Sequence, residues 1–248
     1  YSPVVTIPAK EVGFVSAAFG IPSDAAIPVF GSLTNWWFYL FVTFLIMIPQ
    51  VWLATSLAEL GRFEEAVSIA EGAVGAAEGV QQLYTIAYTN LILGYIHLGR
   101  GDLDRALPVV ERSRALAETW QIALLGPGSA MALAQVYAAL GRHADAAPLL
   151  GPRPIPKRAQ ASMRHFRRAQ ALLDLGRTGD ALAVAGQAVE LAREFRERGD
   201  EGHALRLLGD AHARYAPRDS ERAETCYRQA LALAEAGVHV AVNYRQRK

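Results

Sequence analysis

Cysteine is almost absent from this 248-residue sequence: Cys226 is the single example, which excludes a disulfide framework within the chain. We expect Cys226 to pack on the last helical hairpin, because the neighbouring sequence offers its thiol no obvious histidine partner for catalysis. Net charge is also nearly absent, at a formal +1, and aromatic residues do not alternate with basic ones. A chain of this kind is not expected to bind nucleic acid.

Recognisable catalytic and metal-binding motifs are missing as well. The sequence has no P-loop lysine motif, no zinc-ligand spacing and no nucleophile elbow. Its histidines include no pair four residues apart, the spacing that places two ligands on one face of a helix. We therefore predict that the protein is not an enzyme and has no catalytic, metal-binding or cofactor-binding residues. The histidines are His97, His143, His165, His203, His212 and His239.

Charged residues are missing from a long stretch near the N-terminus. None occurs between residues 25 and 58, and this stretch contains the apolar run 36–48. A helix that is apolar on all sides is buried in protein or in lipid. The run is 13 residues long, or 21 when it is extended back to Pro28. A membrane span needs about 20 apolar residues, so both kinds of burial stay open.

We predict that residues 35–53 form a single transmembrane helix, with lipid contacts across the range 28–53. The segment 1–34, which contains several prolines and glycines, is expected to be extended. The alternative is a hydrophobic helix that covers the open end of the domain that follows. Arginines are frequent after the run, so the positive-inside tendency favours a cytoplasmic location for that domain. Four aromatic residues are candidate membrane anchors: Trp36, Trp37, Tyr39 and Trp52.

A repeat occupies most of the remaining chain. A glycine followed five residues later by an alanine recurs with steps of 40, 40 and 35 residues between glycines. A fifth copy is centred on Ala223, where residues 215–222 replace the usual tight turn. Self-similarity at such periods indicates stacked helical hairpins. The four clean copies are Gly61 with Ala66, Gly101 with Ala106, Gly141 with Ala146, and Gly176 with Ala181.

Small residues recur around each of these turns. We expect each glycine to supply the left-handed turn, and the small side chains to let two antiparallel helices approach closely. A second set of alanines follows seven residues, or two helical turns, later: Ala73, Ala188 and Ala230. The predicted pairs of small residues are Gly94 with Ala106, Ala54 with Ala66, Ala134 with Ala146, Ala169 with Ala181, and Gly209 with Ala223.

This pattern resembles the tetratricopeptide repeat family over residues 50–236. The phrase from Leu57 to Phe63 is similar in style to the repeat tails of bacterial signalling ATPases and cyclase-like regulators. The resemblance implies an all-α solenoid of about five antiparallel hairpins. In two respects the chain departs from the family: the closing proline is missing, and the third copy loses its second helix early, at Pro148 and 151–156. The matching residues are Leu93, Gly94, Tyr95, Gly101, Ala106, Leu133, Ala134, Tyr137, Gly141, Ala146, Gly176, Ala181 and Ala188.

The resemblance also implies a concave face, lined by the first helix of each repeat, that binds a peptide or helix of a partner. The family's groove positions correspond here to Tyr88, Leu91, Tyr95, Met131, Gln135, Phe166, Gln170, Asp174, Arg206, Asp210 and Arg214.

One basic cluster lies between Asp145 and Asp174, a range without any acidic residue. It is either a docking patch for an acidic protein, phosphate or lipid headgroups, or a solvated loop and helix start. Its members are Arg153, Lys157, Arg158, Arg164, Arg167 and Arg168.

The tail 237–248 departs from the repeat, because its residues alternate as in a strand. Together with the preceding residues it resembles the segment from helix to second strand of short-chain dehydrogenases. The glycine-rich phosphate loop of that family is missing, so we do not predict dinucleotide binding.

Taken together, these features predict a non-catalytic protein–protein interaction scaffold. We expect it to be a membrane-anchored accessory subunit of a larger membrane complex, with other subunits as partners. The alternative is a soluble regulatory repeat module, or a fragment of a bacterial signalling ATPase or transcriptional regulator. A reductase fragment is the third hypothesis, and the missing glycine-rich loop argues against it.

Overall fold

The computed structural model describes residues 4–8, 26–30, 48–79, 82–122, 124–151, 161–215 and 219–236. Strands β1 (Val4–Pro8) and β2 (Ala26–Phe30) pair antiparallel near the N-terminus, with Val4 opposite Phe30. The sequence predicted an extended segment there but not that its strands would pair. The predicted transmembrane segment lies largely outside the described residues, because 31–47 are not described.

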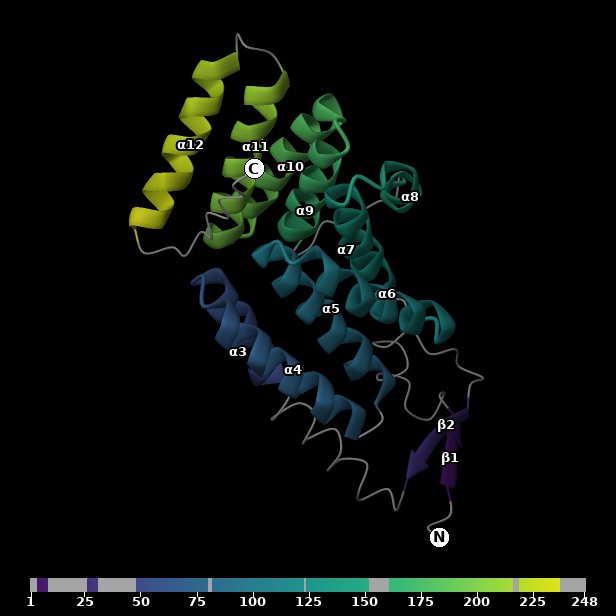
Figure 1. The fold of residues 1–248 in the computed structure, drawn as a ribbon. Helices are drawn as coiled ribbons and strands as arrows, with labels where there is room; N and C mark the ends of the chain where they lie inside the picture. The colour runs from purple at the N-terminus through teal and green to yellow at the C-terminus, as the bar shows by residue number, and fades with distance from the viewer. Residues whose placement is uncertain are drawn as a thin grey trace. The chain divides into compact units, whose positions relative to one another are not determined.

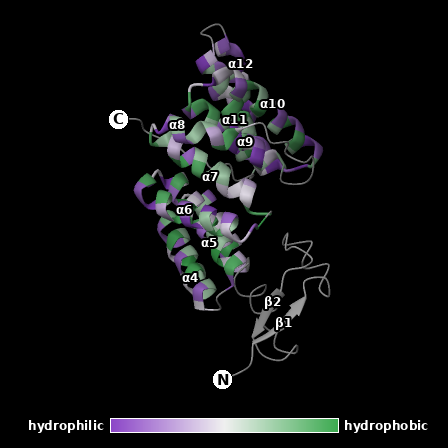
Figure 2. Ribbon diagram, turned by 90° about the vertical axis from the view of Figure 1, so that its right-hand side faces the viewer, coloured by the Kyte–Doolittle hydropathy of each residue, from purple (hydrophilic) through white to green (hydrophobic). Residues whose placement is uncertain are grey.

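The rest of the described chain is helical and forms a TPR-like succession of hairpins (Figure 1). We call the helices that begin the hairpins, α3, α5, α7, α9 and α11, the first helices. Hydrophobic and hydrophilic bands alternate along the helices (Figure 2). The helices are α3 (Ile48–Glu59), α4 (Phe63–Gly79), α5 (Leu83–Arg100), α6 (Leu103–Thr119), α7 (Gly126–Ala139), α8 (His143–Ala146), α9 (Ala161–Asp174), α10 (Thr178–Glu194), α11 (Arg198–Tyr215) and α12 (Ser220–Glu235).

The chain divides into two compact units. Unit 1 comprises Tyr1–Ala58 and Arg62–Ser129, and unit 2 comprises Glu59–Gly61 and Ala130–Lys248. The division falls within α7. We describe each unit separately.

The turns inside four hairpins are left-handed glycines, as the sequence predicted. Gly61, Gly101, Gly141 and Gly176 have φ between 73° and 86°. After α5, the Gly101 N–H donates to Leu98 O and the Asp102 N–H donates to His97 O at 2.9 Å. These bonds satisfy carbonyls that the end of a helix would otherwise leave unpaired.

Small residues lie where paired helices cross. A Cβ atom on Gly94 of α5 would lie 2.2 Å from Cγ2 of Val110 on α6, a distance that no real contact tolerates. Ala106 on α6 is completely buried. In unit 2, a Cβ on Gly209 would lie 2.7 Å from the ring of Tyr227. The close approach is therefore confirmed, although the atoms facing these two glycines are Val110 and Tyr227 rather than the alanines paired with them in the sequence.

The third hairpin has a very short second helix, as predicted. Helix α8 ends at Ala146 and continues only as a 3₁₀ turn, η3 (Ala147–Leu150). Pro148 donates no N–H, but it does not explain the change alone, because Pro108 lies at the equivalent position inside the 17-residue helix α6. Only Ala146 and Leu150 of this second arm are buried.

One buried histidine lies near the end of α5 in unit 1. His97 is buried, and its Nδ1 has no hydrogen-bond partner among the described residues. Burial lowers the pKa of the imidazole, against the opposing effect of the Asp102 and Glu71 carboxylates. The folded chain therefore favours the neutral ring.

The left-handed turn at Gly101 can be tested by substitution. Gly101→Ala places a Cβ at φ +86° and is expected to lower the free energy of unfolding by about 1–2 kcal/mol. Gly72→Ala is the matched control, because Gly72 lies inside α4 with open space around it. There the same change should stabilise by up to about 1 kcal/mol. Urea unfolding measures both, and equal signs would contradict the assignment of the turn.

The stability of the protein should depend on pH through His97. Unfolded histidine binds a proton near pH 6.5, above the folded pKa of His97. The stabilisation due to His97 is therefore complete above that pH and is lost as the pH falls through it. In urea unfolding at pH values between about 7.5 and 5, the wild type should lose stability more steeply than His97→Gln. Parallel profiles would show that His97 does not contribute.

Candidate protein-binding surfaces

The first candidate surface lies on α5 in unit 1. Tyr84, Tyr88 and Tyr95 are spaced for one side of a helix, and we call them the tyrosine face. The rings of Tyr84 and Tyr88 are stacked with centroids 6.1 Å apart. The Tyr95 hydroxyl donates to Gly128 O at 3.2 Å. Leu91, predicted to line the groove, is only 5% exposed, so it supports this face from below.

Burial affects the chemistry of two of these tyrosines. It raises the pKa of both the Tyr84 and Tyr88 phenols. Both therefore stay protonated at neutral pH and keep an O–H that can donate a hydrogen bond. All three tyrosines are half-buried, so each presents part of its ring to solvent.

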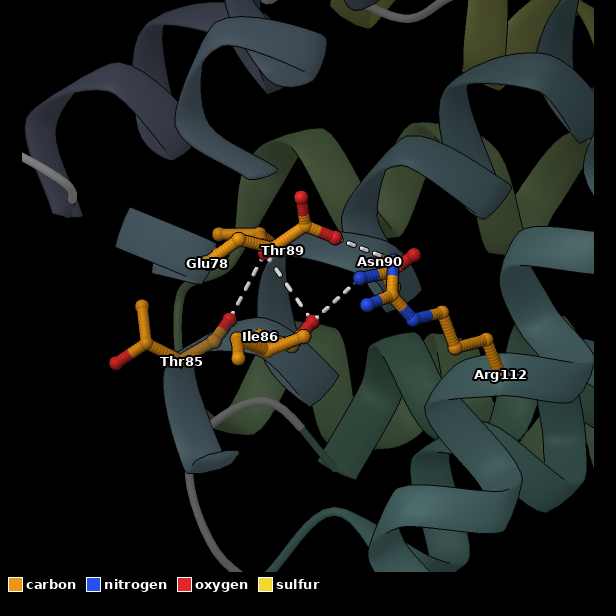
Figure 3. A network of polar contacts seen from close by, with 6 residues as sticks. All are labelled: Glu78, Thr85, Ile86, Thr89, Asn90 and Arg112. Carbon is orange, nitrogen blue, oxygen red and sulfur yellow. Dashed lines mark hydrogen bonds and ion pairs between the residues drawn. The ribbon is translucent and has the colours of Figure 1, made fainter. Parts of the chain in front are cut away.

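Polar side chains lie on and beside α5 away from the tyrosine face (Figure 3). Thr89 donates to Thr85 O at 2.9 Å, and Asn90 donates to Ile86 O at 2.7 Å; both side chains are buried. Arg112 of α6 pairs with Glu78 of α4 at 2.5 Å (Figure 3). Thr89 and Asn90 are thus satisfied within α5 and do not offer a binding site, while the Ser113 hydroxyl of α6 donates to Ala87 O at 2.8 Å and joins α6 to α5.

The second candidate surface belongs to unit 2. Met131 and Phe166 are half-buried and pack against the core of that unit. The ring of Phe166 stacks on His203 at 5.3 Å. Gln135, also predicted for the groove, is 4% exposed, and its Nε2 donates to Arg167 O at 2.9 Å. Gln135 therefore joins α7 to α9 and contributes almost no surface.

Polar residues of α9 and α11 surround these apolar ones. The Arg206 guanidinium lies 2.9 Å from Asp210, which also accepts from the Tyr227 hydroxyl at 2.7 Å. The remaining predicted residues make weaker internal contacts, Gln170 with Asp174 at 3.2 Å and Arg214 with Leu173 O at 3.4 Å. We call Gln170, Asp174, Arg206, Asp210 and Arg214 the charged face.

Tyr227 was not among the predicted site residues. It lies on a second helix, α12, and reaches Asp210 across the helix pair. Burial and the Asp210 carboxylate raise its pKa, so it remains a hydrogen-bond donor. The sequence did contain a signal for this contact, because Gly209 leaves room for a large side chain on the facing helix.

The basic cluster is only partly described, because Arg153, Lys157 and Arg158 lie outside the described residues. Arg168 donates to the carbonyls of Leu150 and Gly151, at 3.1 and 3.4 Å, and so holds the end of η3. Arg168 is therefore a structural residue rather than a free member of a docking patch. Arg167 lies over the ring of Phe166 at 5.7 Å, beside the apolar part of unit 2.

A buried serine between two carboxyl groups was not predicted. Ser162 at the start of α9 is fully buried and hydrogen-bonds to Glu197 and, at 2.7 Å, to Asp200. Burial raises the pKa of Asp200 and the Glu197 charge adds to this, while Ser162, His203 and Arg167 act in the opposite direction. These partners are more than thirty residues apart, so local patterns give no sign of the contact.

The described residues provide no basis for metal or thiol chemistry. Among them, no group of three or more histidine, cysteine, aspartate or glutamate side chains could hold a metal ion. Cys226 is buried on α12, and burial raises the pKa of its thiol, which disfavours the reactive thiolate.

The described residues include only a small part of the segment predicted to lie in a membrane. None of the helices described is both long and apolar enough to span a bilayer. Trp36, Trp37 and Tyr39 lie outside the described residues, and so does the tail 237–248. Trp52 lies on α3 and is 53% exposed.

Hairpins with left-handed glycine turns and small residues at their crossings define a helical repeat protein of the protein-interaction class. The tetratricopeptide repeat profile matches residues 48–71, 88–112, 127–152 and 163–187. Four segments of the chain are therefore similar to tetratricopeptide repeats, and α11–α12 follow the matched segments.

Comparison with solved structures finds similar repeat proteins. TPR-like repeats of a kinesin light chain from Podosopora anserina are 18% identical, with 77% of this chain and 95% of that chain covered and a TM-score of 0.51. BtubC (BKLC) from P. vanneervenii is 16% identical, with 84% and 89% covered and a TM-score of 0.48. MamA from MSR-1 is 25% identical, with 77% and 99% covered and a TM-score of 0.39.

At this identity the kinesin light chain repeats show a shared fold alone. A search of curated protein sequences found no match. The comparisons give no support to the predicted resemblance to signalling ATPase tails or to dehydrogenases.

Proposed function

We propose that this chain is a non-catalytic scaffold that binds partner proteins through its first helices. The observation that carries the proposal is the presence of half-buried aromatic and charged side chains on the first helices of both units. Tetratricopeptide repeats imply protein–protein interaction, and tyrosine and arginine are enriched among the residues that dominate binding energy.

The two faces differ in what they offer to a partner. The tyrosine face provides large apolar rings with hydroxyl tips, whereas the charged face provides Arg206 and Arg214 beside acidic residues. Aromatic rings supply buried area at a low entropy cost. Charged residues contribute orientation and association rate. The tyrosine face would contribute mainly to the affinity for a partner, and the charged face mainly to the choice of partner.

Tyr88→Ala and Arg206→Ala test this proposal. Arg222→Ala is the matched control, because Arg222 is exposed on the second helix α12. Proteins that co-purify with the tagged full chain should be lost with Tyr88→Ala or Arg206→Ala and kept with Arg222→Ala. Truncation of a residue at the centre of an interface should weaken the affinity by about 30-fold or more. Retention of every partner by both variants would place the interface elsewhere.

We also propose that residues 28–53 anchor the chain to a membrane, as a single-pass accessory subunit with cytoplasmic repeats. The charge-free stretch 25–58 supports this, as do Trp52 and Leu53, which are 53% and 51% exposed on α3. The alternative is a soluble regulatory module, possessing the same interaction surfaces, from a bacterial signalling ATPase or regulator.

Lysine substitutions within the apolar run distinguish the membrane-anchored scaffold from the soluble one. A lysine in the middle of a membrane span costs about 2.5–3.5 kcal/mol, so the double substitution Leu40→Lys and Leu45→Lys should move the full chain from the membrane to the soluble fraction. Leu231→Lys, at an exposed position of α12, is the control and should not change the fractionation. A wild-type chain that is soluble and monodisperse without detergent would exclude the anchor.

A further inference from the structure

The tyrosine face belongs to an unusually uncharged helix. Residues 83–99 of α5 contain no aspartate, glutamate, lysine or arginine. In unit 2, by contrast, α9 and α11 carry the charged face. A partner's charged side chain placed against α5 would lose hydration without gaining an opposite charge from this helix, which is unfavourable.

The tyrosine face also offers a hydrogen-bond donor but no carboxylate acceptor from α5. Tyr88 is half-buried, and its hydroxyl has no hydrogen-bond partner among the described residues. A phenol is protonated at neutral pH and burial raises the pKa of Tyr88 further, so this hydroxyl can donate a hydrogen bond to a partner. With no carboxylate on the helix over 83–99, the face offers a partner aromatic rings and the Tyr88 hydroxyl donor rather than anionic acceptors.

We propose that the tyrosine face binds an uncharged, proline-rich segment of a partner protein in the polyproline II conformation; this inference rests on the scaffold function proposed above. Proline has no N–H, so such a segment presents mainly carbonyl acceptors, which complement the hydroxyl donor of Tyr88. Its rings pack on aromatic side chains, and its backbone is already ordered before binding. The parallel rings of Tyr84 and Tyr88 form the platform, and the Tyr88 hydroxyl donates to a carbonyl of the segment.

A helical partner fits these observations less well. Each carbonyl of a helix already accepts one bond within the helix, so a helical partner offers the Tyr88 donor fewer open acceptors than an extended segment does. An amphipathic helix is also recognised by apolar anchors that enter a hydrophobic groove, whereas Leu91 beneath this face is already buried.

The test uses the full chain and a fluorescein-labelled peptide of three Pro-Pro-Leu-Pro repeats, followed by fluorescence anisotropy. Wild type should bind saturably, and raising NaCl from about 50 to about 300 mM should change Kd less than about twofold. Tyr88→Ala should weaken binding by about tenfold or more. Tyr88→Phe, which keeps the ring but loses the donor, should weaken it by about three- to tenfold. Arg222→Ala, at an exposed position of α12, is the control and should leave Kd unchanged.

Circular dichroism and urea unfolding establish whether Tyr88→Ala is folded, and Tyr88→Phe tests the donor if it is not. Absence of saturable binding, equal binding by all variants, or tighter binding of an amphipathic leucine–lysine helical peptide would overturn the inference. The scaffold proposal is judged separately. If native partners are lost with Tyr88→Ala while the proline-rich peptide fails to bind, the scaffold stands and the polyproline assignment is wrong.

Discussion

The close approach of two helix backbones within a hairpin is the constraint on which the other features depend. Gly94 against Val110, and Gly209 against Tyr227, leave no room for even one added carbon atom. A left-handed glycine then reverses the chain within two or three residues. Each of these glycines therefore leaves room for the side chain that faces it, a valine in unit 1 and a tyrosine ring in unit 2.

This constraint separates supporting residues from those that can bind a partner. Thr89, Asn90 and Gln135 have polar side chains on first helices, but they bond within the protein. The tyrosines of α5 and the charged residues of α11 remain on the accessible side. The two units therefore combine similar hairpins with different surface chemistry, one aromatic and uncharged, the other mixed with both signs of charge.

The parts of this architecture that depend on backbone conformation could be predicted from the sequence. Glycine at a left-handed turn acts locally, so Gly101 identifies its turn directly. Contacts between side chains one repeat apart could not be predicted, because they depend on rotamers and on the crossing of helices. Ser162 with Asp200, Tyr227 with Asp210, and Arg168 with Leu150 O are of this kind. The repeat also predicted which helix would carry each groove residue, but it did not predict the burial of Leu91 and Gln135.

Because the third hairpin is short, the free energy of local unfolding differs along the chain. In repeat proteins each hairpin is stabilised mainly by its immediate neighbours, so cooperativity weakens wherever a hairpin buries little. The arm formed by α8 and η3 buries only Ala146 and Leu150, and Arg168 holds its end through two carbonyl contacts. Segments with so little buried apolar surface open at a small fraction of the global free energy of unfolding. Amide exchange and proteolytic cleavage should therefore begin at this arm, well before the longer hairpins of unit 2 unfold.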